Sequence, residues 1–139
     1  MIYVIGIGPG SKELMTMQCI DAIKDAEVIV GYKTYIILIT DLIEGKEVVQ
    51  NGMRQEIDRC REAVEIAKTG KKVAVISSGD AGIYGMAGLI LELTAKEEQN
   101  IDVKVVPGVT ASIGAAAILG APIMHDFCHI SLSDLLTPW

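Results

Sequence analysis

Residues 2–11 read IYVIGIGPGS, an apolar run that ends in a turn with three glycines. The same arrangement returns twice, as VAVISSGDAGIYG over residues 73–85 and as VKVVPGVTAS over residues 103–112. A short apolar run of this kind is typical of a strand buried in a parallel sheet, and open α/β sheets bind ligands at the carboxyl ends of their strands. Glycine lets the main chain approach a ligand and present its N–H groups. The three turns therefore predict one small-molecule site built largely from main chain.

The composition limits the partners that the chain can bind. The net charge is −6 over 139 residues, and the Lys and Arg residues are scattered, which argues against a nucleic-acid surface. Half of the residues are hydrophobic, which is enough for the core of one domain. The longest apolar stretch, residues 111–124, is interrupted by glycine and proline and is shorter than the roughly 18 residues of a membrane span. We therefore expect no nucleic-acid partner and no membrane partner.

The cysteines indicate a reducing compartment. Cys19, Cys60 and Cys128 are odd in number and far apart, and no CxxC pair exists, so neither a structural zinc site nor a disulfide framework is expected. The amino terminus begins directly with a strand-like run and has no basic segment followed by a cleavable apolar one. These features predict a reduced, cytoplasmic protein.

Apolar runs alternate along the chain with segments of helical spacing. We expect strands over residues 2–6, 27–31, 48–49, 72–77 and 102–106, and helices over residues 12–25, 32–43, 53–69, 83–96 and 109–119. Residues 35–39 alone also fit a strand, and residues 130–132 fit the opening of another. The alternation predicts an α/β fold, with a parallel sheet flanked by helices on both faces.

Local signals place the ends and faces of two of these helices. Ser11 is the expected cap of the helix over residues 12–25. In the helix over residues 53–69, Ile57 and Cys60 are expected to face inward, and Gly70 is expected to end the helix in a left-handed conformation.

The carboxyl-terminal residues allow two interpretations of the domain organisation. We expect residues 1–127 to form one amino-terminal α/β domain, and residues 128–139 to begin a hinge into a second α/β domain that is absent from this chain. The alternative is a short terminal segment without a further domain.

The first turn departs from the dinucleotide-binding fingerprint G-x-G-x-x-G. Ser11 stands at the third glycine position, and Pro9 lacks the N–H donor that a pyrophosphate needs. Gly31 and Tyr32 end the second expected strand, where an acidic residue would contact a ribose. These departures disfavour a nicotinamide enzyme and leave a simple strand-to-helix turn as the alternative to a ligand loop.

The second and third turns carry more specific signals. Asp80, beside Gly79, is suited to accept hydrogen bonds from ribose hydroxyls or to pair with an ammonium, and the alternative is that it caps the next helix. Gly85 and Gly88 are expected to permit close helix packing. The third turn leads into the small residues 110–117, against which either a ligand base or a neighbouring strand can lie.

The segment after these turns holds the metal-capable side chains His125, Asp126, Cys128 and His129. Their spacing matches no standard zinc pattern, so we expect no metal. No nucleophile–base pair and no pair of carboxylates stands out in the sequence. This pattern fits a reaction in which an activated cofactor is positioned by the protein.

Together, the motifs GIGPGS (residues 6–11), AIKDAEVIVGY (22–32), SGDAGIY (78–84) and VPGVTAS (106–112) resemble the tetrapyrrole (corrin/porphyrin) methylases. The resemblance covers essentially the whole chain. It implies an S-adenosylmethionine-dependent methyltransferase, a homodimer, with its cofactor in the cleft between two α/β domains. It further implies that the cofactor is lined by Gly79, Asp80, Ile83, Tyr84, Thr110 and Ala111, and that the loop of Gly8, Pro9 and Gly10 faces the tetrapyrrole.

Residues 119–139 are similar to the branch that methylates C-17 of precorrin-3B or cobalt-factor III in cobalamin biosynthesis. In that branch methylation is coupled to ring contraction, for which His125 and Asp126 are the acid–base candidates. The alternatives are a methylase of the same fold acting at another ring position, and a non-catalytic cofactor-binding fragment. The carboxylates of such a substrate would meet a basic patch of Lys12, Lys33 and Arg54, or residues of the second domain.

Overall fold

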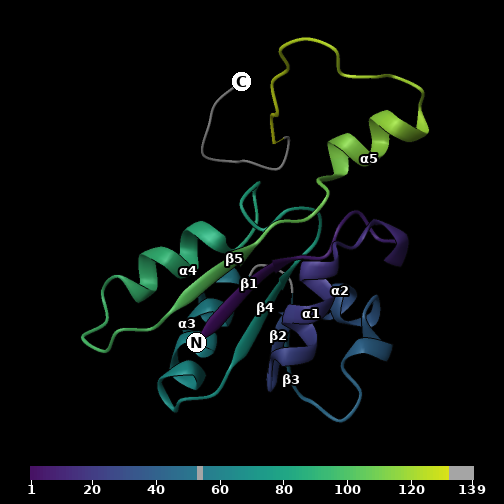
Figure 1. Cartoon of the computed structure of the whole chain (residues 1–139). Helices are drawn as coiled ribbons and strands as arrows, with labels where there is room; N and C mark the ends of the chain where they lie inside the picture. The colour runs from purple at the N-terminus through teal and green to yellow at the C-terminus, as the bar shows by residue number, and fades with distance from the viewer. Residues whose placement is uncertain (53–54, 132–139) are drawn as a thin grey trace.

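The computed structural model describes residues 1–52 and 55–131. The strands are β1 (Ile2–Gly6), β2 (Val28–Tyr32), β3 (Glu47–Asn51), β4 (Val73–Ser77) and β5 (Val103–Val106). The helices are α1 (Met17–Asp25), α2 (Lys33–Ile37), α3 (Glu56–Lys68), α4 (Ala87–Thr94) and α5 (Ala111–Ile118), with 3-10 helices at Lys12–Leu14 and Thr40–Leu42. The strands form one parallel sheet in the order β3-β2-β4-β1-β5, which confirms the predicted α/β class (Figure 1).

Helices cover both faces of the sheet, as the alternation predicted. On one face, α1 and α2 pack Cys19, Ile23 and Ile36 against side chains of β1 and β2 (Figure 1). On the other face, α3 and α4 contribute Cys60 and Ile90 to a second apolar core. All five residues of β1 and of β4 are buried, because these two strands lie in the middle of the sheet with helices on both sides.

The order of the strands creates a switch point between β1 and β4. The chain leaves β1 toward β2 on one side of the sheet, whereas it leaves β4 toward β5 on the other side. The loops after these two adjacent strands therefore diverge. Such a point at the carboxyl edge is where open α/β sheets leave room for a ligand.

The helix expected over residues 12–25 begins later than predicted. Lys12–Leu14 form a separate 3-10 turn, and α1 starts at Met17. Thr16, and not Ser11, is the cap, because its Oγ1 accepts a hydrogen bond of 3.0 Å from the N–H of Cys19. Ser11 makes no such bond.

The helix expected over residues 32–43 is broken. It is helical over Lys33–Ile37, so the alternative of a strand at residues 35–39 is wrong. The hydroxyl of Thr40 donates to the carbonyl of Ile37 at 3.0 Å, a local bond that competes with a regular helix.

Two further expectations about helix faces and strands need correction, and one is confirmed. Ile57 lies in the first turn of α3 and is 52% exposed, so the expected inward orientation is wrong. Residues 130–131 form no strand, and Leu132 lies outside the described residues. Gly70 follows α3 with a φ of +92°, the left-handed conformation that its sequence position predicted.

A polar cluster at the amino edge of the sheet makes stability depend on pH. Lys72 Nζ donates to Asp25 at 2.7 Å and Tyr3 Oη donates to it at 2.5 Å, and these bonds lower the pKa of Asp25. A lowered pKa stabilises the fold above the ordinary carboxyl pKa of about 4, and this contribution disappears as the pH falls through the lower value.

We therefore expect the urea midpoint of the wild-type chain to fall more steeply below about pH 4 than that of Asp25→Asn. Urea titrations of both proteins between neutral pH and about pH 3 measure the difference. Parallel decreases in the two proteins would show that Asp25 does not carry this dependence.

Candidate functional site

The first two glycine turns pair with each other through main chain. The N–H of Gly8 donates to the carbonyl of Gly79 at 3.0 Å, and the N–H of Gly79 donates to the carbonyl of Gly8 at 2.8 Å. Both glycines have positive φ, +77° for Gly8 and +61° for Gly79. This bridge extends the contact between β1 and β4 past the ends of both strands, at the switch point of the sheet.

The third turn packs directly onto this bridge. A Cβ atom on Gly108 would lie 2.2 Å from the carbonyl oxygen of Gly79 and 2.5 Å from that of Gly6. A Cβ on Gly6 would in turn lie 2.6 Å from the oxygen of Gly79. Because the neighbouring atoms are main chain, they cannot move aside as a flexible side chain would. The three turns are therefore in contact and require glycine at these positions.

Asp80 connects the second and third turns. Its Oδ2 accepts from the N–H of Gly108 at 2.9 Å, and its Oδ1 accepts from the N–H of Gly82 at 2.8 Å. Asp80 does not cap the next helix, because α4 begins only at Ala87. The N–H of Met86, the residue before α4, donates instead to the hydroxyl of the buried Ser77. The capping alternative is therefore wrong, and Asp80 holds the two turns together.

The glycines after Asp80 differ in role. A Cβ on Gly85 would lie 2.3 Å from the carbonyl oxygen of Ala81, so this position packs closely against main chain as expected. Gly88 has open space around it, and the expectation of close packing there is wrong.

Tyr84 adopts a strained conformation beside the turns. Its φ is +53°, which is costly for a residue with a Cβ and explains why α4 starts after it rather than at residue 83. The hydroxyl donates to the carbonyl of His129 at 3.0 Å and accepts from the N–H of Ser131 at 3.1 Å. Tyr84 thereby connects the second turn to the segment that follows α5.

A cavity of 280 Å³ opens where the three turns meet. We call it the glycine-turn cavity, and its lining residues are Pro9, Ser78, Gly79, Asp80, Ile83, Tyr84, Thr110, Ala111 and His129. All six residues that the sequence assigned to a cofactor are in this set, as is Pro9 of the first loop. Gly8 and Gly10 are not.

Two lining residues, Ser78 and His129, were not among the site residues predicted from the sequence. Ser78 immediately precedes Gly79 in the second turn, so its position in the motif was a usable signal. His129 lies eleven residues after the end of α5, in a segment without helix or strand, and lines the cavity. Its ring lies edge-on to that of Tyr84, with 5.6 Å between the ring centroids. No periodic pattern could have placed it there.

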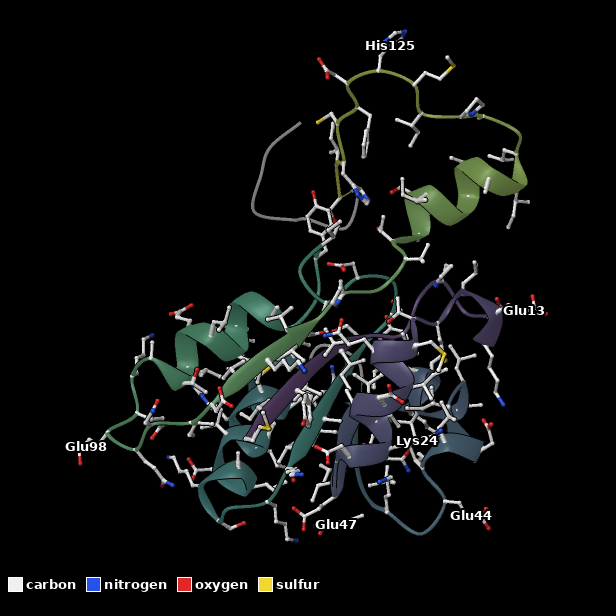
Figure 2. All side chains as sticks on the ribbon, in the orientation of Figure 1. Glu13, Lys24, Glu44, Glu47, Glu98 and His125 are labelled. Carbon is white, nitrogen blue, oxygen red and sulfur yellow. The ribbon has the colours of Figure 1, made fainter. Side chains whose placement is uncertain are left out.

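The structure does not bring His125 and Asp126 to this cavity. Both are exposed, and Figure 2 shows His125 at the outer bend of the segment after α5, far from the sheet. Of the four metal-capable residues of this segment, only His129 lines the cavity. Within residues 1–52 and 55–131, no three His, Cys, Asp or Glu side chains gather into a possible metal site.

The described residues include two of the three members of the expected basic patch. Lys12 forms an ion pair with Asp41, Lys33 is exposed, and Arg54 lies outside the described residues. Several acidic side chains, including Glu47 and Glu98, lie at the opposite end of the molecule from α5 (Figure 2).

These features define an α/β protein with a cavity built from glycine turns at the switch point of a parallel sheet. In the described residues, no helix has the length and apolar character of a membrane span. The model of the Tetrapyrrole (Corrin/Porphyrin) Methylases matches residues 1–139. The chain belongs to this family, as its motifs implied.

Individual relatives carry more specific names. The chain is 60% identical over 139 residues to the probable cobalt-factor III C(17)-methyltransferase of Salmonella typhimurium, a match that covers 100% of this chain and 58% of that protein. It is 40% identical over 141 residues to the precorrin-3B C(17)-methyltransferase of a Sinorhizobium species, covering 99% of this chain and 55% of that protein.

Among solved structures, the methyltransferase CobJ is similar with a TM-score of 0.90 and 42% sequence identity, over 99% of this chain and 58% of that one. The chain thus spans little more than half the length of these relatives.

Proposed function

We propose that this chain binds S-adenosylmethionine as part of a methyltransferase that acts on C-17 of cobalt-factor III or precorrin-3B, with ring contraction, in cobalamin biosynthesis. The observation that carries the proposal is the cavity formed by three mutually packed glycine turns at the switch point. The names of relatives at 60% and 40% identity support the choice of substrate and ring position. A methylase of the same fold acting at another position is the second candidate.

The residues of the glycine-turn cavity suit an adenosyl ligand. Gly79 leaves the floor without a side chain, since a Cβ there would project toward the Ala111 N–H at 3.5 Å. Ile83 and Ala111 provide apolar surface for a base, and Asp80 provides carboxylate oxygens for hydroxyl groups. At 280 Å³ the cavity is below the roughly 300–1,000 Å³ of most small-molecule sites. The relatives are longer than this chain, so we propose that further residues of the same protein complete the site.

The proposed reaction needs alignment more than a conventional catalytic triad. When bound, the cofactor would supply an electrophilic methyl group on a sulfonium sulfur for attack by an electron-rich ring carbon. The paired turns hold the cofactor in a fixed position, and the loop of Gly8, Pro9 and Gly10 is proposed to face the tetrapyrrole. His125 and Asp126 remain our proposed acid–base pair for ring contraction, which requires the segment after α5 to lie closer to the substrate when it is bound.

Two finer features of the protein are also proposals. We infer a homodimer, which is supported by the apolar side chains that α5 and the following segment expose, among them Ile118 at 85% and Met124 at 78%. We infer a cytoplasmic location, which is supported by the free thiols of Cys19 and Cys60, whose pKa burial raises to about 11. The boundary between residues 127 and 128 also remains a proposal.

Filling the glycine-turn cavity should weaken cofactor binding. Ala111 lines the cavity at the start of α5, so we expect Ala111→Leu to weaken S-adenosylhomocysteine binding by about tenfold or more in calorimetric titration. Ala115→Leu is the matched control, because Ala115 is exposed on the same helix and does not line the glycine-turn cavity. Equal affinity of the two variants would place the cofactor elsewhere.

The ring position is tested by the product. The chain is incubated with cobalt-factor III and S-adenosylmethionine carrying a ¹³C-methyl group, and ¹³C NMR locates the new carbon. Attachment at C-17 supports the proposal, and attachment at another carbon favours the second candidate. Intact S-adenosylhomocysteine binding without methyl transfer would indicate that this chain alone is a cofactor-binding fragment.

A further inference from the structure

A second cavity, of 310 Å³, lies beside the glycine-turn cavity. We call it the arginine cavity, because it is lined by Arg59 together with Tyr32, Tyr35, Glu56 and Ser77. Ser78 and Tyr84 line both cavities, so the two are adjacent at the carboxyl edge of β2 and β4.

Arg59 is buried although it carries a charge. It lies on the inner side of α3 with 3% of its surface exposed. Arginine is rarely buried to this extent without a partner, because removing its charge from water costs several kcal/mol. A buried guanidinium that lines a cavity therefore needs an explanation from its surroundings.

Those surroundings satisfy the guanidinium only in part. One nitrogen, Nη2, donates to the carbonyl of Gly52 at 2.9 Å, and the ring of Tyr32 lies 6.0 Å from Cζ. The Nε–H group is buried and has no hydrogen-bond partner among the described residues. Glu56 lines the same cavity but is exposed, and no carboxylate within residues 1–52 and 55–131 forms an ion pair with Arg59.

We propose that the arginine cavity is a carboxylate-binding subsite, in which the partly satisfied guanidinium of Arg59 donates to a carboxylate of a ligand seated in the adjacent glycine-turn cavity. A planar carboxylate matches the fork of donors on a guanidinium. The acidic side chain of Glu56 at the same cavity disfavours a multiply charged phosphate. Under the proposed function, this carboxylate belongs either to the methionyl part of the cofactor or to an acidic side chain of the tetrapyrrole.

The test observes the Arg59 Nε–H resonance by ¹H–¹⁵N NMR, assigned through its loss in Arg59→Lys. Three probes are titrated: S-adenosylhomocysteine, 5′-methylthioadenosine, which keeps the adenosyl group but lacks the carboxylate, and an octacarboxylate porphyrin. A shift with S-adenosylhomocysteine but not with methylthioadenosine supports the subsite with the methionyl carboxylate as occupant. A shift with the porphyrin alone supports the subsite with a tetrapyrrole carboxylate as the occupant.

Failure of the subsite is distinguishable from failure of the proposed function. If S-adenosylhomocysteine perturbs Gly79 and Ala111 while no probe moves Arg59, the subsite is overturned and the cofactor site stands. If neither S-adenosylhomocysteine nor the porphyrin perturbs any residue, succinate at constant ionic strength is the remaining probe. A shift of Arg59 with succinate then supports the subsite without the proposed function, and no shift overturns the subsite as well.

Variants separate carboxylate binding from a structural role. We expect Arg59→Gln to lower the affinity for the carboxylate probe that shifts the Arg59 Nε–H resonance by at least about tenfold. The affinity for methylthioadenosine should stay unchanged. Arg61→Gln is the matched control, because Arg61 lies on the same helix with its side chain 65% exposed. If Arg59→Gln weakened both ligands equally, Arg59 would serve only to hold Gly52 and the proposal would be overturned.

Discussion

Replacing Gly108 with alanine is expected to destabilise the fold by about 3 kcal/mol. The added Cβ would lie 2.2 Å from the carbonyl oxygen of Gly79 and 2.5 Å from that of Gly6. Both contacts are with main-chain atoms of the neighbouring turns. The steric clash can therefore be removed only if the three turns move apart. The free energy of unfolding from urea titration measures the effect, and the same separation should also remove S-adenosylhomocysteine binding.

Gly88→Ala is the control, because it is expected to raise the free energy of unfolding rather than lower it. Gly88 lies in α4 with nothing within 4 Å of an added Cβ, so alanine there should stabilise the helix by about 0.5–1 kcal/mol. If Gly108→Ala were as stable as the wild type, the three turns would not be packed as described.

Asp80→Ala is expected to cost about 2 kcal/mol of unfolding free energy. The carboxylate accepts from Gly108, Gly82 and Ile83, and its loss leaves these N–H groups without their acceptor. Because the bond to Gly108 connects two turns, we also expect weaker S-adenosylhomocysteine binding. Urea titration and calorimetry measure the two effects.

Two control variants accompany Asp80→Ala: a conservative substitution at the same position, and an alanine substitution of an exposed aspartate. Asp80→Asn keeps one acceptor oxygen and should lose less stability than Asp80→Ala. Asp21→Ala removes an exposed carboxylate from α1 and should leave stability within about 0.5 kcal/mol of the wild type. An Asp80→Ala protein as stable as Asp21→Ala would mean that Asp80 does not hold the turns together.

The central part of the fold was predictable because its signals are local and periodic. The runs that became β1, β4 and β5 are mostly apolar and lead into glycine turns, and their carboxyl ends define the edge at which the glycine-turn cavity lies. The residues that the resemblance to the tetrapyrrole methylases implied for the cofactor also line one cavity, because the motifs that carry the resemblance follow directly after these strands. These residues follow the strand ends by only a few positions, so the strands determine where they lie.

The errors arose where side chains compete with regular structure. Thr16 replaced Ser11 as the cap of α1, and the strained conformation of Tyr84 delayed the start of α4. Neither outcome follows from periodicity, because each depends on one side-chain bond or one dihedral angle.

Contacts between distant segments were also beyond the sequence. Arg59 on α3 reads as an ordinary charged helix residue, and only the packing of α3 on the sheet buries it beside β2 and β4. His129 reaches the cavity through a segment without regular structure. Their positions required the three-dimensional arrangement.

The central claim is that the three glycine turns form a cofactor site in this chain. The most direct test is a ¹H–¹⁵N NMR titration of the wild-type chain with S-adenosylhomocysteine, with NADH as the control. We predict that the amide resonances of Gly79, Ile83 and Ala111 shift with S-adenosylhomocysteine and not with NADH. Shifts confined to other parts of the chain, or equal shifts with NADH, would contradict the account.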